Sequence, residues 1–393
     1  MKRVCHIIFE HRIFDGRIFH KEVVSLAKHG FEVILLVPSV DNRTLGLKKE
    51  AQLSADGAFT SEGITFRTYH YNKKLPKQLN IRQYFCKRDL MKQLIKIDAD
   101  VYHFHEDGLT LEIAAKLKDV LPNKKLVFDF HEFFLSSYRE KKRKIDRIND
   151  YIKLENVIVK KADLIFTVTD FISDYYRTLS NCPVVTLFNC QSEQIFPEIE
   201  TRDTNNGIFW LVHEGRLLFD RGLKLMIEVA RKLKSPNVKI LCVGNLPKTE
   251  QKYFEIKTRE YNIQDKFHIT GFLPYTEVPT WLAKGKAGLT FMMSDNAKAV
   301  ISNKFFNYLR YGLPILTLHH PITDKIIDEF ELGYTFDTTE VDQIVEHIQQ
   351  LASNSELYEK LSQNAKTAFQ TTYNWENMEK RLIGGYRKLL EDK

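Results

Sequence analysis

Two stretches of the sequence place basic residues where a phosphate could bind. The first, 215–222, follows an apolar run and carries Arg216 and Arg221 between two glycines. Each guanidinium offers a planar fork of donors and stays charged at every relevant pH. We expect Arg216 and Arg221 to converge on a diphosphate. The alternative is a pair of surface arginines that form salt bridges to Glu214 or Asp220.

The second stretch, 302–314, is typical of a loop, a short helix and a tight turn before an apolar strand. Phe305, Tyr308 and Leu309 recur at helical spacing and predict one buried face. The helix should therefore begin at Ser302-Asn303-Lys304, where free backbone N–H groups and a lysine side chain attract an anion. We expect a phosphate here.

Three polar stretches in the first half could also carry chemistry. Residues 11–22 link the first apolar run to the first helical pattern, and there Asp15 could cap the helix while Gly16 turns the chain. Asp129-Phe130-His131-Glu132 and His103-Phe104-His105-Glu106 each end an apolar run. A histidine that ends a strand at an open edge is a candidate for hydrogen bonding to substrate, although a lone histidine is more often structural.

A metal site is the less favoured interpretation of these histidines. His103 and His105 would share one face of a strand, but no cysteine lies near them in the sequence. Asp98 and Asp100 precede the strand and are better read as a turn and a strand start. We therefore expect neither a metal nor another cofactor.

The elements that would position these residues alternate along the chain. Strand-like apolar runs separated by helical patterns predict an α/β fold with parallel sheets covered on both faces. In the first half we expect strands at 2–9, 33–37, 64–71, 101–104, 125–130, 164–168 and 184–188, with helices at 19–28, 81–97, 109–121, 144–161 and 170–179. In the second half we expect strands at 208–212, 238–243, 267–269, 287–291 and 315–318, and helices at 222–233, 249–262, 276–284, 321–330, 339–352, 355–370 and 375–391.

The polar segment 192–207, with Pro197 and an Asn-Asn-Gly turn, is typical of a linker between two domains. A chain of 393 residues is also long enough for two cores. We predict an N-terminal domain at 1–192, a C-terminal domain at 193–374 and a final helix at 375–393. Ligands of such sheets bind at the carboxyl ends of the strands, so the site should lie where these ends face each other.

Composition limits the function classes. The five scattered cysteines indicate reduced thiols, and no apolar run approaches the length of a membrane-spanning helix. We expect a cytoplasmic protein without a signal peptide. The net charge of +7 includes two basic clusters, at 73–92 and 139–147, that are either solvated surface or contacts to anionic membrane lipids. Nucleic acid is not expected as a partner, because no nucleic-acid-binding motif accompanies the charge.

The motifs together resemble the retaining GT-B glycosyltransferases of family four. That family commonly reads Asn-Lys-x-Phe-Glu-Tyr-x-x-x-Gly-x-Pro, and this chain matches it from Asn303 and Lys304 onward except that its glutamate is Asn307. The family's glutamate holds ribose hydroxyls; an amide still offers one acceptor and two donors. A second family glutamate corresponds to Ala299. Trp375 is similar to the family's tryptophan at the last helix, though it could equally pack one helix on its neighbour.

The resemblance implies a GT-B fold of two Rossmann-like domains and assigns the site residues. Arg216, Arg221 and His131 would be catalytic: the arginines stabilise the departing diphosphate, and His131 bonds a sugar hydroxyl while Asp129 or Glu132 orients its ring. The implied donor-binding residues are Gly16, Gly215, Gly244, Asn245, Phe272, Leu273, Ser302, Asn303, Lys304 and Asn307. The implied acceptor-side residues are His11, Asp15, Arg17, His105 and Glu132, with Arg17 also adding positive charge.

The function implied is retaining transfer of a sugar from a nucleotide diphosphate, UDP-sugar being favoured over GDP-sugar. The acceptor would be a glycan or lipid-linked glycan in surface polysaccharide synthesis, at the inner face of the membrane. One alternative is a non-catalytic GT-B-like scaffold that binds nucleotide or glycan, which Asn307 and Ala299 favour. An epimerase on the same fold would need a pair of acid/base carboxylates, and the sequence does not identify one.

Overall fold

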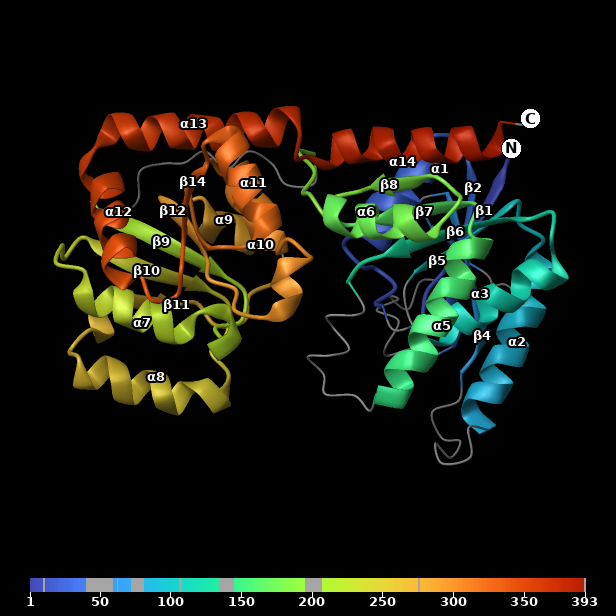
Figure 1. Cartoon of the computed structure of the whole chain (residues 1–393), viewed down its shortest axis with the longest axis horizontal. Helices are drawn as coiled ribbons and strands as arrows, with labels where there is room; N and C mark the ends of the chain where they lie inside the picture. Colours follow the sequence, from blue (N-terminus) through green and yellow to red (C-terminus); the bar gives the residue numbers. More distant parts are fainter. Residues whose placement is uncertain are drawn as a thin grey trace. The chain divides into compact units, whose positions relative to one another are not determined.

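The computed structural model describes residues 1–9, 11–39, 59–61, 63–71, 81–105, 108–133, 145–194, 207–274 and 276–391. The chain forms two compact units (Figure 1). Unit 1 contains Met1–Phe188 and Met378–Lys393, and unit 2 contains Asn189–Asn377. Each unit is an α/β layer structure around its own parallel sheet, which confirms the predicted fold class. No disulfide joins the cysteines in the described parts of the chain.

The sheet of unit 1 has eight strands in the order β3-β4-β2-β1-β5-β6-β7-β8. Only β3 runs antiparallel to its neighbour. The strands are nearly continuous apolar runs because helices cover both faces. Their bounds are β1 Arg3–Ile7, β2 Glu32–Ser39, β3 Phe59–Ser61, β4 Ile64–His70, β5 Val101–His105, β6 Lys125–Phe130, β7 Leu164–Thr167 and β8 Val184–Thr186.

Helices α2, α3 and α5 lie side by side over one face of this sheet (Figure 1). The helices of unit 1 are η1 Ile18–Val23, α1 Val24–Lys28, α2 Ile81–Ile97, α3 Gly108–Val120, α5 Ile145–Lys161, α6 Asp170–Leu179 and the greater part of α14 Trp375–Leu390.

The first helix differs from its prediction at 19–28, because it opens as the π-helix η1. His20 N–H donates to Asp15 O (3.2 Å) and Glu22 N–H donates to Arg17 O (3.0 Å), both across five residues. The wider turns bury Lys21 and Glu22 as well as the apolar residues. Such π-turns are rare in proteins overall, but those that occur often lie at functional sites.

The sheet of unit 2 has six parallel strands in the order β11-β10-β9-β12-β13-β14. The strands are β9 Phe209–Glu214, β10 Val238–Val243, β11 Phe267–Ile269, β12 Ala287–Thr290, β13 Ile315–Leu318 and β14 Gly333–Phe336. The helices are η2 Phe219–Arg221, α7 Leu223–Lys232, α8 Lys248–Glu260, η3 Gln264–Lys266, α9 Val278–Leu282, η4 Asp295–Lys298, α10 Asn303–Arg310, α11 Pro321–Phe330, α12 Val341–Ser353 and α13 Ser355–Thr371.

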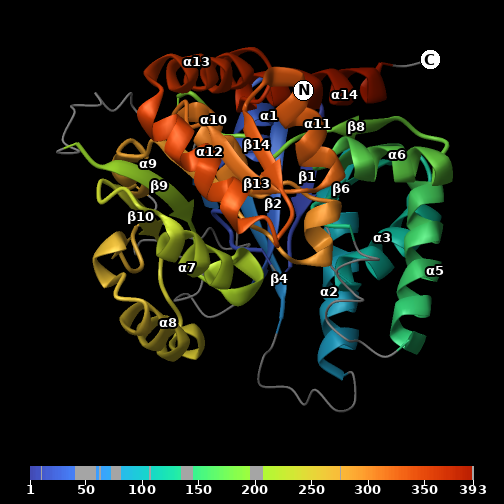
Figure 2. The ribbon, with the colours of Figure 1, turned by 60° about the vertical axis from the view of Figure 1, so that its left-hand side comes forward.

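Each sheet reverses its strand order at one point. Figure 2 shows the ribbon of both units turned by 60°. In unit 1 the chain steps outward from β1 to β2 and β4, and then returns to the other side of β1 with β5. In unit 2 the same reversal separates β9 from β12. Open α/β sheets bind ligands outside the carboxyl ends of the strands at such points. The loops after β1, β5, β9 and β12 are therefore where chemistry is expected.

Gly222 sits at one of these points and allows a close contact that no other residue could make. Its φ is +86°, and a Cβ built there would lie 2.4 Å from Phe291 Cβ and 2.8 Å from Phe291 O. We predict that Gly222→Ala lowers the free energy of unfolding by about 2–4 kcal/mol, through both strain and clash.

Urea denaturation measures this effect, and Gly384→Ala is the matched control. Gly384 lies inside α14 with nothing within 4 Å of an added Cβ, so alanine there should be neutral or stabilising by up to about 1 kcal/mol. Equal effects of the two variants would contradict the packing argument.

Candidate active site

Backbone geometry in unit 2 brings two glycine loops together at the switch point. Gly215 follows β9 with φ +101°, and its N–H donates to Val243 O at the end of β10 (2.9 Å). Gly244 follows β10, and a Cβ there would lie 2.2 Å from Gly215 O. Leu217 N–H donates to Asn245 O (3.1 Å). Both glycines are needed for the two loops to touch.

Arg221 and Lys304 bring two positive charges to these loops. A Cβ built on Gly215 would lie 3.4 Å from Arg221 Nη1, so the guanidinium lies over the glycine. Lys304 belongs to the first turn of α10 and is 4% exposed. Its Nζ has no hydrogen-bond partner among the described residues. A buried ammonium without a partner is costly, so this one is a candidate for binding an anion.

The surroundings of Lys304 weaken its hold on a proton. Burial, followed by the neighbouring Arg221, lowers the pKa of Lys304 to about 7, while Glu214 opposes the shift. Lys304 and Arg221 also act on buried His213: burial holds the pKa of His213 well below its usual value, and the two cations add to that shift. The two cations therefore share one buried neighbourhood.

Glu214 contacts Asn307, which was not predicted from the sequence. From the sequence, Glu214 was expected only as a salt-bridge partner for arginine. Asn307 Nδ2 donates to Glu214 Oε1 (2.8 Å) and to Oε2 (2.7 Å). Burial raises the pKa of Glu214, and the bond from Asn307 opposes that rise. Tyr308 fixes the arrangement, because its hydroxyl accepts from Glu214 N–H (2.9 Å) and donates to Leu289 O (3.3 Å). Glu214 therefore places a carboxylate next to position 307, where the resembling family has a glutamate.

The other predicted donor-binding residues of unit 2 lie at the rim of this cluster or away from it. Arg216 is exposed, and neither it nor Arg221 forms an ion pair in the described parts of the chain. Asn303 Oδ1 accepts from Asn189 Nδ2 (2.9 Å), and Ser302 is the N-cap of α10 without a side-chain cap. Phe272 is 86% exposed, next to half-buried Leu273, in the turn that follows β11.

In unit 1 a second cluster forms around Asp129 at the end of β6. Arg17 Nε and Nη2 donate to the two Asp129 oxygens (2.8 and 2.9 Å), and His131 Nε2 lies 2.7 Å from Asp129 Oδ2. Burial alone would raise the pKa of Asp129, but Arg17 and then His131 hold it well below its usual value. Asp129 is therefore an anion that fixes the His131 ring.

Two of the predicted acceptor-side residues are buried. Arg17 is 4% exposed and its third donor, Nη1, is bonded to Leu187 O (2.8 Å), so it adds no charge to the surface as we had expected. His105 is fully buried, and its Nδ1 lies 3.3 Å from His131 Nε2. Both side chains are already held by internal partners.

The remaining predicted residues of unit 1 lie in the loop after β1 and at Glu132. Asp15 Oδ1 accepts from the N–H groups of Arg17 and Ile18 (2.8 and 3.0 Å), which is the predicted capping role. Half-buried His11 packs against His131 with the two rings tilted and their centroids 4.9 Å apart. Gly16 is exposed and a Cβ there would meet nothing within 4 Å. Glu132 is exposed.

The structure describes only some residues of the basic clusters 73–92 and 139–147, which are expected to contact a membrane. Within the described residues, no helix is long and apolar enough to cross a membrane. Lys87 of the first basic cluster is ion-paired with Glu112. Residues 139–144 of the second cluster lie outside the described residues.

Comparison with known proteins identifies the family. The model "Glycosyltransferase Family 4" matches residues 17–190, and the model "Glycosyl transferases group 1" matches residues 195–368. The chain is a GT-B glycosyltransferase. No curated protein matches its sequence.

Solved structures share the fold of this glycosyltransferase over nearly their full length. Sucrose-phosphate synthase from Thermosynechococcus elongatus is 14% identical with a TM-score of 0.76, and 99% of each chain is covered. HepE of Anabaena in complex with UDP is 11% identical with a TM-score of 0.75, covering 99% of this glycosyltransferase and 100% of HepE. A glycosyltransferase from Rickettsia africae is 13% identical with a TM-score of 0.71, and the match covers 100% of this chain and 99% of the Rickettsia chain.

Proposed function

We propose that this glycosyltransferase is a retaining enzyme that uses a nucleotide-diphosphate sugar, UDP-sugar before GDP-sugar. The observation that carries the proposal is the cation pair Arg221 and Lys304, which lies at the strand-order reversal of unit 2 beside two glycine loops. Positive charge that forms no ion pair among the described residues, next to half-buried glycine backbone and a helix start, suits a diphosphate.

The preference for uridine rests on the structural neighbours. HepE of Anabaena has been solved in complex with UDP and in complex with UDP-glucose. Its TM-scores of 0.75 and 0.71 to this chain show a shared fold, and the proposal extends the donor named for HepE to this enzyme. The sugar that this enzyme transfers is not specified by these loops.

In the proposed reaction the bond between the anomeric carbon and the diphosphate oxygen breaks, and the acceptor oxygen bonds to the same face of that carbon. The acceptor's proton passes to the departing phosphate oxygen, so no carboxylate nucleophile is needed. Negative charge grows on the diphosphate as the bond breaks. Arg216, Arg221, Lys304 and the start of α10 stabilise that charge, which is usually the largest catalytic contribution. His131, held by Asp129, would bond a sugar hydroxyl.

We assign the ribose contact to the pair of Glu214 and Asn307. Glu214 supplies the carboxylate and Asn307 holds it in place through two hydrogen bonds. The absence of a glutamate at position 307 therefore no longer favours the non-catalytic scaffold.

This assignment predicts that Glu214→Gln weakens UDP binding about 10- to 100-fold, because hydrogen bonds to a charged group contribute about 1.5–3 kcal/mol. Titration calorimetry with UDP measures the change. Glu228→Gln on the exposed side of α7 is the matched control and should bind as the wild type does. The double variant Glu214→Gln/Asn307→Glu moves the carboxylate to the other partner and should regain part of the affinity. Unchanged UDP affinity in Glu214→Gln would remove the pair from the site.

The function itself is tested by incubating the purified chain with a panel of UDP- and GDP-sugars. We expect a thermal shift with UDP, slow donor hydrolysis, and a product whose anomeric configuration by NMR equals that of the donor. An inverted product would overturn the retaining mechanism. A thermal shift without hydrolysis or transfer to any acceptor would support the scaffold instead.

We also propose that the acceptor is a glycan or lipid-linked glycan of surface polysaccharide synthesis and that the enzyme works at a membrane surface. The two basic clusters at 73–92 and 139–147 support this proposal through their attraction to anionic head groups. Co-sedimentation with vesicles containing phosphatidylglycerol, but not with neutral vesicles, is the expected result at low salt. Equal recovery with both vesicle types would argue against a membrane role.

A further inference from the structure

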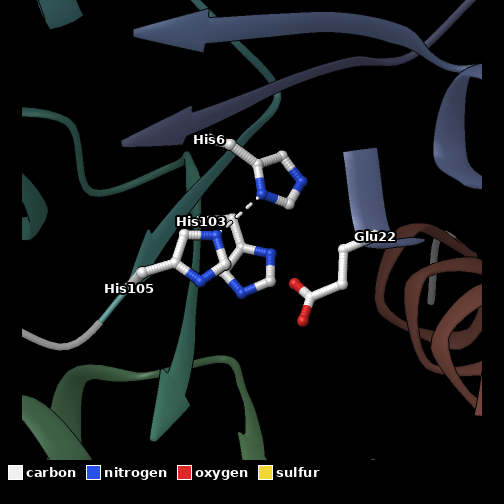
Figure 3. A group of neighbouring side chains, drawn as sticks. All are labelled: His6, Glu22, His103 and His105. Atoms are coloured by element: carbon white, nitrogen blue, oxygen red, sulfur yellow. Dashed lines mark hydrogen bonds between the residues drawn. The ribbon is translucent and has the colours of Figure 1, made fainter. Parts of the chain in front are cut away.

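Three histidines and one glutamate meet inside unit 1 (Figure 3). His6 lies on β1 and pairs in register with His103 on β5, so their side chains share one face of the sheet. His105 stands two residues further along β5 and therefore points to the same face. Glu22 comes from the π-helix η1, whose wide turns bury it.

All four side chains are fully buried, yet several of their polar atoms have nothing to bond to. Among the described residues, His6 Nε2, His103 Nε2 and both Glu22 oxygens lack a hydrogen-bond partner. Buried polar atoms in native proteins almost always have one. The three unsatisfied atoms of His103 and Glu22 therefore indicate a missing ligand.

The Nδ1 atoms of His103 and His105 already have partners. His103 Nδ1 lies 2.7 Å from the Tyr386 hydroxyl. His105 Nδ1 lies 3.3 Å from His131 Nε2 and 3.7 Å from Asp129 Oδ2. This arrangement turns the Nε2 atoms of His103 and His105 toward the cluster. Metal-bound histidines are oriented in this way by a bond from their second nitrogen.

The charges nearby leave one carboxylate without a hydrogen bond. The single N–H of Arg17 Nε donates to Asp129 Oδ2 (2.8 Å), and Glu22 Oε1 lies 2.9 Å from the same nitrogen as an ion pair only. Arg17 therefore satisfies Asp129 and only partly offsets Glu22. Glu22 also faces the second carboxylate, Asp129, and two buried carboxylates that share one arginine are costly unless a further cation joins them.

We propose that His6, His103, His105 and Glu22 bind one divalent transition-metal ion, with Zn²⁺ the best fit. One ligand atom from each residue lies within 4.8 Å of all the others. His6 Nδ1 and His105 Nε2 form a hydrogen bond of 3.0 Å, which coordination of both nitrogens by a metal ion would replace. Their separation is near the roughly 3.3 Å between two ligands of a tetrahedral ion with bonds of about 2.0 Å. Imidazole and carboxylate ligands suit zinc.

The site is a structural one, because four buried protein ligands fill a tetrahedral ion and leave no open position. It ties β1, β5 and η1 together beneath the loop that carries His11 and Asp15. A second possible group, His105 with Asp129 and His131, is weaker because Arg17 already occupies both oxygens of Asp129. The proposal replaces the expectation from sequence that no metal binds.

Metal analysis of the purified full chain tests the proposal directly. We expect close to one equivalent of zinc per chain by mass spectrometry, and a fall in Tm of about 5–10 °C after removal by a chelator, since a ligand bound only to the folded state stabilises it. His103→Gln should lose the metal. His20→Gln is the matched control, because His20 lies exposed in the same helix as Glu22, and it should keep the metal.

Cobalt provides a readout that does not require a folded variant. The metal-depleted wild type should bind one Co²⁺ and show the intense visible bands of a tetrahedral ion, without a thiolate charge-transfer band in the near ultraviolet. A metal-free preparation that gives no such spectrum would overturn the proposal, and so would metal that His103→Gln retains in full. Either result would mean that the four residues form a hydrogen-bonded cluster that shares protons.

Discussion

Replacing Arg216 by alanine is expected to lower kcat about 100- to 1,000-fold, which corresponds to about 2–4 kcal/mol of transition-state stabilisation. The physical reason is the charge that grows on the diphosphate as the sugar leaves. Arg216 is exposed and forms no ion pair in the described parts of the chain, so its donors are available to a ligand. The measurement is initial-rate kinetics with the donor identified from the sugar-nucleotide panel.

The stability of the Arg216→Ala variant should remain within about 0.5 kcal/mol of the wild type, because surface substitutions rarely cost more. Arg231→Ala is the control: Arg231 lies on the exposed side of α7 and is paired with Glu228, so its loss should leave kcat unchanged. Arg216→Lys should recover only part of the rate, because lysine keeps the charge and loses the two-pronged contact. A normal kcat in a folded Arg216→Ala protein would end its assignment to the diphosphate.

Replacing Lys304 by methionine is expected to change activity and stability in opposite directions. Activity should fall at least 100-fold, because a positive charge is removed from the proposed diphosphate site. The free energy of unfolding should rise by about 1–3 kcal/mol at pH 6, because a buried ammonium without a partner is replaced by an apolar chain of similar length.

The pH dependence of this gain follows from the pKa of about 7 that burial and Arg221 give Lys304 in the folded state. The unfolded lysine titrates near its ordinary value of 10.5. Between these values the unfolded chain binds the extra proton, so wild-type stability rises with pH across this range and the cost is complete below pH 7. The gain from Lys304→Met, measured by urea denaturation, should thus be larger at pH 6 than at pH 9. Equal gains at both values would show that Lys304 is not buried as a charge.

Ligand binding should have a matching pH dependence in the wild type. A diphosphate favours the charged lysine, so UDP affinity is expected to weaken as the pH rises above 7 and more of the ligand-free protein holds neutral Lys304. Titration calorimetry at pH 6 and 9 would show this trend. In Lys304→Met the difference should shrink.

The fold was predictable because apolar runs and helical patterns alternate regularly along the chain. The predicted α/β class with parallel sheets is confirmed, and most predicted strands agree with the structure to within a few residues. Short-range spacing also identified the loop before α10 and the loop at 215–222, because a glycine turn and a helix start are local features. Their detailed roles remain predictions.

Features that depend on long-range contacts were not predictable. The bond between Glu214 and Asn307 joins residues 93 positions apart, and Arg17 finds Asp129 across 112 positions. In the sequence Arg17 is simply a charge in a polar loop, so exposure was the natural expectation. The π-helix was missed because one extra residue per turn leaves the apolar pattern of 18–28 nearly unchanged. It alone explains why Glu22 faces inward.

Helix α14 has a consequence for how the protein is made. From Met378 onward this helix belongs to unit 1, and Met378, Leu382 and Tyr386 are fully buried there. Unit 2 is continuous in sequence and can fold once it has left the ribosome, whereas unit 1 is incomplete until residues 378–390 have been translated. A nascent chain halted before Met378 would leave His103 without the hydroxyl of Tyr386 and expose the surface that α14 covers. Termination just before Met378 should therefore yield an aggregation-prone product, not a slightly shortened enzyme.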